Sequence, residues 1–299
     1  MALKIQPGPR FAERTTLRVG GRAQAEILLE SPEDAALLGD ELARHAGRPF
    51  VLGWGSNLLA LDGDLDIAVV SLGQGGGPVR AGLASGQGAG GRELVVVPGG
   101  YMLPKLLNWA AREGLSGMEG LSGIPGTVGG AVAMNAGSYG RETAELLDAV
   151  RVWDMSGGLR WIGPEQWLAA YRRFTPLGLD EPWLVLEARY ALTPAAPVAV
   201  RAAMDDVLAR KKATQPVSAA TCGCVFKNPP GVSAGKMLDE LGFKGKALGG
   251  MRFSNMHANF LVNDGRGTAM AALELIDQAS QAVLERFGVE LELEVKVVQ

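Results

Sequence analysis

The feature that most constrains this chain is a run in which every third residue from Gly114 to Gly129 is glycine. The period ends after six glycines and proline is scarce, which excludes a collagen-like triple helix. Apolar residues such as Ile124 and Val128 lie within the run, whereas turns that only join strands usually contain more Asp and Asn. The stretch therefore suits either a set of packed turns or a buried loop around a ligand, whose polar groups would satisfy the loop backbone.

A second glycine turn follows a short apolar strand predicted at residues 50–52. Its sequence is Gly53-Trp54-Gly55-Ser56-Asn57-Leu58. Such a turn exposes backbone N–H groups that can bind phosphate, and Ser56 and Asn57 add side-chain donors. The turn lacks the third glycine and the acidic residue of a dinucleotide fingerprint, so an ordinary tight turn is the alternative. Two separate glycine nests in one chain favour one long ligand, such as a dinucleotide.

Composition and charge exclude several classes of protein. The chain has 299 residues, is 47% apolar and carries a formal net charge of −3, so it can bury substantial cores and has no basic excess for nucleic acid or a membrane surface. No apolar run reaches the roughly 20 residues of a transmembrane helix, and the N-terminus lacks the apolar stretch of a signal peptide. We expect a soluble, cytoplasmic, monomeric protein.

The few cysteines and histidines argue against a metal site. Cys222 and Cys224 are the two cysteines, and His45 and His257 are the two histidines. This set is too small for a structural zinc site, so we expect no metal. The C-x-C spacing is too close for an ordinary disulfide, and we expect both thiols to be free.

Strand and helix patterns alternate along the chain. Strands are predicted at residues 23–29, 50–52, 67–72, 93–97, 149–154, 159–162, 183–192 and 291–298, and helices at 31–45, 104–112, 198–212 and 268–287. Residues 73–91 contain nine glycines and predict a loop or hairpin at a domain boundary. Residues 194–197, Pro-Ala-Ala-Pro, predict a linker.

The chemistry of the last third of the chain stays open on residue types alone. Cys224, Lys227 and Asn228 place a thiol, a cation and an amide within five residues. A thiol can act as an acid or a nucleophile, or it can simply be buried. By pattern alone, Glu294 lies on the solvated face of the last predicted strand and Arg172 is a surface cation.

Six segments occur in the order typical of the bacterial UDP-N-acetylenolpyruvoylglucosamine reductases, and the chain resembles this family over nearly its whole length. They are Thr15-Thr16-Leu17-Arg18-Val19-Gly20-Gly21, the turn from Gly53 to Leu59, the stretch from Gly123 to Gly140, Gly223-Cys224-Val225-Phe226-Lys227-Asn228-Pro229, His257-Ala258-Asn259-Phe260-Leu261-Val262-Asn263 and Leu291-Glu292-Leu293-Glu294-Val295. The short length resembles the compact members, which lack an extra loop over the substrate. The resemblance implies an α+β protein. An FAD-binding domain of the vanillyl-alcohol-oxidase (PCMH) type, in two subdomains at 1–72 and 73–195, precedes an α+β substrate-binding domain at 196–299.

The resemblance also implies the reaction and the cofactors. NADPH would reduce the bound FAD, and the nucleotide-sugar UDP-N-acetylglucosamine enolpyruvate would then take its place. Flavin N5 would give a hydride to C3 of the enolpyruvyl group, an acid would protonate C2, and UDP-N-acetylmuramate would form. The residues that match FAD contacts are Gly53, Gly55, Ser56, Asn57, Leu58, Ser122, Gly123, Pro125, Gly126, Gly129, Gly130, Ala131, Asn135 and Gly137.

Three residues match the catalytic positions of the family. Cys224 stands where the family usually has the serine that protonates C2, and because a thiol is more acidic than a hydroxyl, proton donation remains feasible. Arg172 and Glu294 match the cation and the acid that stabilise the charge formed after hydride addition. All three assignments come from the resemblance, since the residue pattern alone left them undecided.

Tyr171, Lys227 and Asn228 match substrate contacts. Arg173-Phe174 departs from the family, which often has a small hydroxyl residue there.

Two other functions stay open. One is an oxidase of the same fold. Several such enzymes attach FAD covalently through a histidine, but the only histidine near a motif here, His257, lies in the expected substrate domain, which argues against an oxidase. The other is a non-enzymatic nucleotide-sugar binder, which would be colourless.

Overall fold

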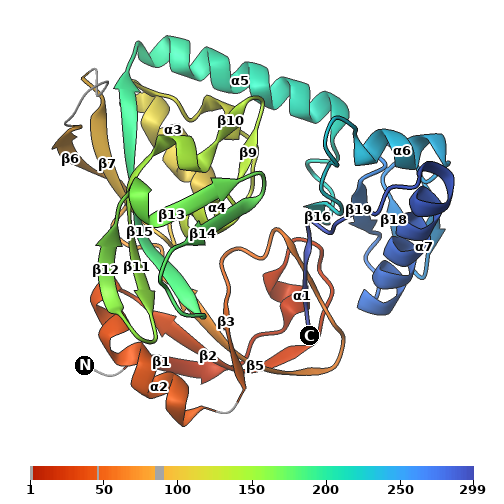
Figure 1. Cartoon of the computed structure of the whole chain (residues 1–299), viewed down its shortest axis with the longest axis horizontal. Coiled ribbons are helices and arrows are strands. Elements are labelled where there is room, and N and C mark those ends of the chain that lie inside the picture. The colour runs from red at the N-terminus through yellow and green to blue at the C-terminus, as the bar shows by residue number, and fades with distance from the viewer. Residues whose placement is uncertain (1–2, 46, 85–90) are drawn as a thin grey trace. The chain divides into compact units, whose positions relative to one another are not determined.

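The computed structural model describes residues 3–45, 47–84 and 91–299 (Figure 1). It divides into two compact units. The first comprises Met1–Gln6, Glu26–Gly53 and Ala68–Arg210, and the second comprises Pro7–Ala25, Trp54–Ile67 and Lys211–Gln299. Strands β2 (Arg22–Leu29) and β5 (Asp64–Leu72) and helix α5 (Pro197–Thr214) contribute residues to both units. The two units are groups of residues that contact one another, whereas the three expected domains are functional parts of the sequence. The domain boundaries at 72 and 195 therefore stay predictions.

The first unit is built on a sheet of order β12-β11-β15-β7-β6, with β8 beside β15. The strands are β6 (Val79–Leu83), β7 (Glu93–Pro98), β8 (Leu115–Ser116), β11 (Leu147–Asp154), β12 (Gly158–Ile162) and β15 (Trp183–Pro194). The predicted strands at 93–97, 149–154, 159–162 and 183–192 are confirmed. In the glycine-rich stretch, β6 pairs antiparallel with β7, which is the predicted hairpin, while residues 85–90 of that prediction lie outside the described residues.

Helices contact this sheet on both of its faces. On one face, α3 (Leu103–Arg112) and α4 (Val128–Ala133) share a core cluster with Ala188 and Tyr190 of β15. On the other, α2 (Leu38–Arg44) shares a cluster with Leu184 and Leu186. The central strand β15 is apolar on both faces because it is covered on both.

The first turns of the helix predicted at 31–45 differ slightly from the prediction. Ser31 and Asp34 form the expected capping box, and Pro32 stands in the first turn. The first turns adopt a 3-10 helix, η1 (Pro32–Leu37), before α2 begins at Leu38. The predicted helix at 31–45 is therefore present in two parts.

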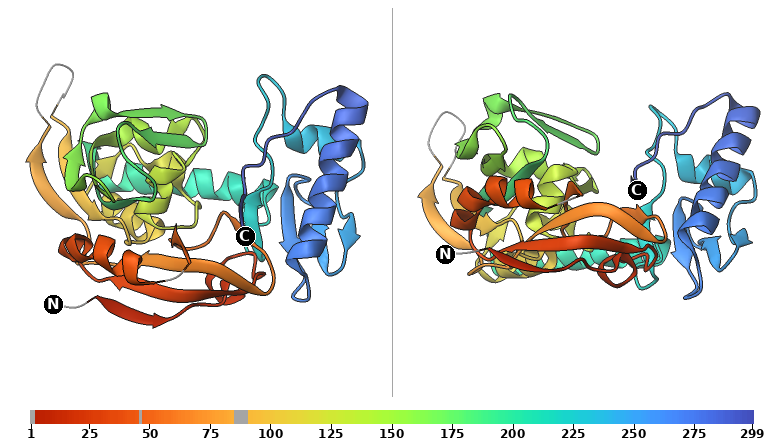
Figure 2. Two further views of the ribbon diagram at one scale, coloured as in Figure 1. Left: turned by 60° about the horizontal axis from the view of Figure 1, so that its bottom comes forward. Right: turned by 90° about the horizontal axis from the view of Figure 1, so that it is seen from below.

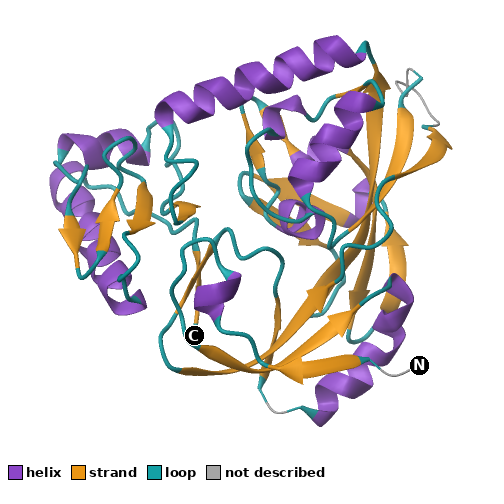
Figure 3. Ribbon diagram, turned by 180° about the vertical axis from the view of Figure 1, so that it is seen from behind, coloured by secondary structure: helices purple, strands orange, loops and turns teal. Residues whose placement is uncertain are grey.

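The second unit contains a sheet of order β16-β19-β18-β17. Its strands are β16 (Thr221–Cys224), β17 (Ala247–Leu248), β18 (Met251–Phe253) and β19 (Phe260–Asn263). Helices α6 (Ala234–Glu240) and α7 (Ala269–Phe287) pack with it (Figures 2 and 3). Helix α7 confirms the prediction at 268–287, since Thr268 Oγ1 accepts the Ala271 N–H at 3.2 Å and Gly288 ends the helix at φ 68°.

The closing strand predicted at 291–298 is wrong in its first half. Only β20 (Lys296–Val298) forms, in parallel with β4 (Leu58–Ala60). Residues 291–295 instead pair irregularly through a bridge between Phe226 and Leu293, so the two-residue alternation fails. Leu293 is 36% exposed, whereas Glu294 is half-buried.

The remaining elements are short. They are β1 (Lys4–Pro7), α1 (Phe11–Arg14), β3 (Arg48–Val51), η2 (Glu119–Leu121), β9 (Gly137–Ser138), β10 (Arg141–Glu142), η3 (Thr143–Leu146), η4 (Pro164–Gln166), β13 (Trp167–Ala170) and β14 (Arg173–Pro176). Strands β1, β2, β5 and β3 form one sheet in that order. Within the described part of the chain, none of the helices has the length and apolar character needed to cross a bilayer.

Candidate active site

In the first unit, the glycine run folds back on itself and begins α4. Thr127 caps this helix, and its Oγ1 accepts an amide of the first turn at 3.3 Å. The next amides bond to the segment after β7: the Val128 N–H donates to Tyr101 O at 2.9 Å and the Gly129 N–H to Gly99 O at 2.8 Å. These donors are therefore used inside the protein, and packed turns describe this part of the run.

Close packing explains why several of these positions are glycine. A Cβ on Gly129 would lie 3.2 Å from two backbone carbonyl oxygens. A Cβ on Gly53 would lie 2.7 Å from Thr127 Oγ1, so the turn after β3 closely approaches the cap of α4. Gly123 and Gly126 have φ values of 77° and 136°, which L-residues rarely adopt. The two glycine motifs found in the sequence thus meet through Gly53 and Thr127.

Asn135, a predicted cofactor residue, is fully buried and has φ 40°. Its Nδ2 donates to Glu142 Oε2 at 2.7 Å and to Ala170 O at 3.0 Å, and its Oδ1 accepts the Ala144 N–H at 2.9 Å. Both N–H bonds and the oxygen are engaged within the unit. Because Ala170 ends β13, Asn135 supports the hairpin that carries Arg172.

The predicted pair Tyr171-Arg172 forms the turn between β13 and β14. Arg172 has φ 56°, and its Cζ lies 4.7 Å from the centroid of the Tyr171 ring. Holding the backbone of a non-glycine residue in the left-handed region costs energy, and residues with such a backbone cluster at functional sites. Phe174, where the sequence departs from the family, is buried with its ring 5.4 Å from Trp167 and 6.3 Å from Trp183. The departure therefore anchors the hairpin in the core.

A cavity of about 300 Å³ lies in the first unit where β2 and β5 end. Its walls include Leu72, Gly75 and Pro98, together with Glu30 and Glu187. The sequence analysis assigned no chemistry to the glycines of this loop. Glu30 pairs with Lys4 and Glu187 pairs with Arg151, so neither carboxylate is an unpaired charge in the wall.

In the second unit, the rest of the glycine turn is fastened to the C-terminal segment. Gly55 has φ 68°, and a Cβ there would lie 2.2 Å from Arg14 O. Asn57 Nδ2 donates to Glu294 O at 2.9 Å, and Asn57 O accepts the Lys296 N–H at 3.0 Å. Ser56 stands between these residues, and the buried Leu58 that follows opens β4. The turn is thus held in place by the backbone of Glu294.

Cys224 ends β16 and is half-buried. The strand has a register shift between Thr221 and Cys224, with Gly223 at φ 82°. Cys222 packs in the core, and burial raises the pKa of its thiol to about 12, with the Glu294 carboxylate adding to the effect. Neither cysteine forms a disulfide within the described residues.

Lys227 and Glu294 lie on two paired segments. The Glu294 N–H donates to Val225 O at 2.8 Å, and the Lys227 N–H donates to Glu292 O at 2.8 Å. Lys227 Nζ also pairs with Glu292 Oε1 at 2.5 Å, but Glu292 is 72% exposed, so this ion pair is weak. Asn228 Oδ1 accepts the first amide of α6 at 3.0 Å. The structure therefore brings the segments of Cys224, Lys227 and Glu294 together.

His257 has a packing role. Its Nδ1 accepts the Asn259 N–H at 3.2 Å, and its ring centroid lies 5.0 Å from that of Phe260. Burial lowers the pKa of the imidazole, and the nearby Lys244 lowers it further. A Cβ on Gly235 would lie 2.7 Å from Cε1 of this ring, so α6 packs directly against it. Across residues 3–45, 47–84 and 91–299, no His, Cys, Asp and Glu side chains are grouped to hold a metal ion.

Comparisons with known proteins find two family models that match separate parts of the chain. The family described as "FAD binding domain" matches residues 23–163, and the family described as "UDP-N-acetylenolpyruvoylglucosamine reductase, C-terminal domain" matches residues 215–298. The chain is 46% identical to the UDP-N-acetylenolpyruvoylglucosamine reductase of Nitratidesulfovibrio vulgaris over 99% of both chains. It is 41% identical to that of Caulobacter vibrioides, over 96% of this chain and 92% of the relative. The crystal structure of the Thermus caldophilus reductase matches with a TM-score of 0.80 and 36% identity, covering 99% of this chain and all of that one. The predicted fold class is confirmed.

Proposed function

We propose that this chain, which belongs to the UDP-N-acetylenolpyruvoylglucosamine reductase family, reduces UDP-N-acetylglucosamine enolpyruvate to UDP-N-acetylmuramate with NADPH as hydride donor. It is an FAD-dependent oxidoreductase of peptidoglycan precursor synthesis. The observation that carries the finer proposal is the bond from the Glu294 N–H to Val225 O, which joins the predicted acid to the residue after the predicted proton donor.

The glycine turns fit an FAD pyrophosphate. Gly53 and Gly55 stand where a Cβ would collide with Thr127 Oγ1 and Arg14 O, and Gly123 and Gly126 adopt positive φ, so glycine lets these turns take the shape of a backbone nest. We assign FAD contacts to the predicted residues of both turns, with Gly129 and Asn135 acting through the backbone that they hold in place. When bound, FAD carries a hydride from NADPH to C3 of the enolpyruvyl group.

Cys224 is the proposed donor of the proton to C2. It lies half-buried at the end of β16, where it can face a ligand, while Cys222 stays protonated in the core. Hydride addition at C3 leaves negative charge toward the substrate carboxylate. We assign its stabilisation to the Arg172 guanidinium and the Glu294 carboxyl group, and the strained turn of Arg172 agrees with such a role.

The substrate phosphates and carboxylate are assigned to Lys227, Asn228 and Tyr171. Lys227 pairs with the exposed Glu292, and a phosphate can replace such a weakly held carboxylate. The Asn228 oxygen is used by α6, so its amide N–H₂ is the group that would contact the substrate. The Tyr171 ring is 41% exposed next to Arg172 and offers an aromatic face.

An anaerobic absorption titration tests the proposal. The flavin band should bleach when NADPH is added and return when UDP-N-acetylglucosamine enolpyruvate is added. A bleached band that only oxygen restores would refute the substrate and point to an oxidase. The absence of a flavin band even after FAD is added would refute the enzyme and favour a nucleotide-sugar binder.

A further inference from the structure

We infer that Asn259 is a positioning residue whose side-chain amide fixes the segment that carries Cys224 and Lys227. The amide does so by bonding both backbone groups of Phe226. The part of this inference that concerns proton transfer rests on the function proposed above. The part that concerns the position of Cys224 does not.

The contacts of Asn259 are bidentate and buried. Its Oδ1 accepts the Phe226 N–H at 2.9 Å, and its Nδ2 donates to Phe226 O at 2.8 Å. Its own carbonyl accepts the Val225 N–H at 2.8 Å. Asn259 and Phe226 are both about 1% exposed, so water cannot replace these bonds.

The course of the backbone explains why an amide stands at this position. Strand β16 pairs with β19 up to Cys224, which lies opposite Phe260. The backbone just before Phe260, at the start of β19, forms a tight turn in which the Phe260 N–H donates to His257 O at 3.0 Å. Asn259 therefore supplies from its side chain the acceptor and the donor that a continuing strand would have supplied to Phe226. Among side chains, only Asn and Gln offer both in one amide.

The other edge of the same segment bonds to the C-terminal residues. Val225 O accepts the Glu294 N–H and the Lys227 N–H donates to Glu292 O, each at 2.8 Å. Residues 225–227 thus lie between Asn259 on one side and residues 292–294 on the other. Loss of the amide would release Phe226 on the Asn259 side, while the bonds to residues 292–294 would stay, so residues 225–227 would be free to shift relative to β19 and to displace Cys224 and Lys227.

The test compares Asn259→Ala and Asn259→Asp with Leu275→Ala in the flavin-containing full chain. Leu275 is buried in the core of the same unit, so its truncation lowers the melting temperature and serves as the control for general destabilisation. In Asn259→Ala, flavin reduction by NADPH should stay near the wild-type rate. Reoxidation by the enolpyruvyl substrate should slow by about 10- to 100-fold, as expected for a shift of about 1 Å at a reacting group.

Asn259→Asp adds a readout that depends on protonation. An ionised carboxylate would face Phe226 O and repel it, whereas a protonated one can donate to it. The slowing of reoxidation relative to wild type should therefore shrink as pH falls. A slowing that stays the same at every pH would overturn the assignment of the bidentate bond.

Alkylation of Cys224 by iodoacetamide gives a readout that needs no substrate. The buried Cys222 should stay unmodified, and the Cys224 rate should rise several-fold in Asn259→Ala but not in Leu275→Ala. Equal alkylation rates in the two variants would overturn the positioning role, and faster alkylation with unchanged reoxidation would overturn the link to proton transfer. If wild-type flavin is not reoxidised by the substrate, the proposed function fails, and alkylation still decides whether Asn259 positions Cys224.

Discussion

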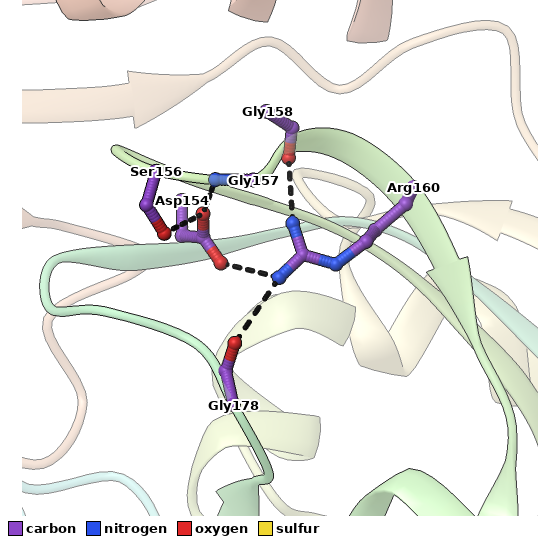
Figure 4. A network of polar contacts seen from close by, with 6 residues as sticks. All are labelled: Asp154, Ser156, Gly157, Gly158, Arg160 and Gly178. Atoms are coloured by element: carbon purple, nitrogen blue, oxygen red, sulfur yellow. Dashed lines mark hydrogen bonds and ion pairs between the residues drawn. The ribbon is translucent and has the colours of Figure 1, made fainter.

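Replacing Arg160 with glutamine is expected to leave a buried carboxylate without its cation (Figure 4). Asp154, at the end of β11, has no exposed side-chain surface. It accepts hydrogen bonds from the Gly157 N–H, from Ser156 Oγ at 3.4 Å and from Arg160 Nη2 at 2.6 Å. Burial acts to raise the pKa of Asp154, but the bonds from Arg160 and Gly157 outweigh it and hold the pKa below its ordinary value.

The expected loss follows from the exposure of the two partners. Breaking a buried ion pair costs about 3–5 kcal/mol, and a hydrogen bond to a charged group contributes about 1.5–3 kcal/mol. Arg160 is 31% exposed, and Asp154 keeps its bonds to Gly157 and Ser156, so the lower end applies. We expect Arg160→Gln to lower the free energy of unfolding by about 2–3 kcal/mol at pH 7, or the melting temperature by roughly 5–10 °C.

The sign of the pH dependence separates this mechanism from lost packing. In the wild type the lowered pKa of Asp154 contributes stability that is present above the unfolded pKa and is lost as pH falls through the folded pKa. In Arg160→Gln burial dominates and the folded pKa rises, so this variant loses stability as pH rises through that folded pKa. The difference between the two proteins should therefore be largest near neutral pH and shrink toward pH 4.

Chemical and thermal unfolding at several pH values, followed by tryptophan fluorescence, would measure this difference. Trp153 in β11 and Trp161 in β12 lie in the hairpin that contains Asp154 and Arg160, so their fluorescence reports on it. Arg141→Gln is the matched control, because Arg141 and Glu145, four residues apart in the chain, form an exposed pair with side chains 42% and 46% exposed. Its loss should stay below about 0.5 kcal/mol. Equal losses in the two variants, or a loss that does not change with pH, would refute the reasoning.

Three further predictions concern the candidate site. Gly55→Ala should abolish FAD binding or folding, because a Cβ would lie 2.2 Å from Arg14 O, whereas Gly140→Ala, with positive φ but nothing within 4 Å, should cost only about 1 kcal/mol in an unfolding assay. Cys224→Ala should leave flavin reduction by NADPH intact and slow substrate reoxidation by orders of magnitude, with Cys224→Ser close to wild type; equal stopped-flow rates for Cys224→Ala and wild type would remove the thiol from the mechanism. Glu294→Gln should slow the same half-reaction, and normal turnover would leave Glu294 with a structural role only.

Local patterns predicted the elements whose ends and faces are encoded nearby. Helix α7 has its cap at Thr268, its stop at Gly288 and an apolar stripe between them, so its prediction was accurate. The β13–β14 hairpin was not predicted. Its strands have four residues each, and its turn is made by Tyr171 and Arg172, where local rules expect Gly or Asn at a positive φ. The anchor of this hairpin is the buried Phe174, a tertiary contact that no short-range pattern encodes.

The sequence identified the glycine motifs, but it did not reveal whether each glycine serves ligand contact or close packing. A run of glycines is compatible with ligand contact and with close packing, and the structure uses Gly129 for the second, since its N–H bonds to Gly99 O. Asn135 was predicted as a cofactor contact on its motif alone. Its three side-chain bonds reach residues 7 to 35 positions away in the chain, and only the folded structure reveals that they support the Arg172 hairpin.

Glu294 illustrates why sequence periodicity cannot identify an acid of this kind. Period-two alternation gives Glu292 and Glu294 the same solvated face, yet Glu292 is 72% exposed and Glu294 is half-buried. Both residues bond to the segment after Cys224 through the backbone, but Glu294 also bonds on its other side: its N–H donates to Val225 O, and its carbonyl accepts Asn57 Nδ2 from 237 residues away. These two bonds join the predicted cofactor turn to the segment after Cys224. A residue pattern at 291–295 contains neither partner, so the distinction between a surface glutamate and a candidate catalytic acid exists only in the tertiary fold.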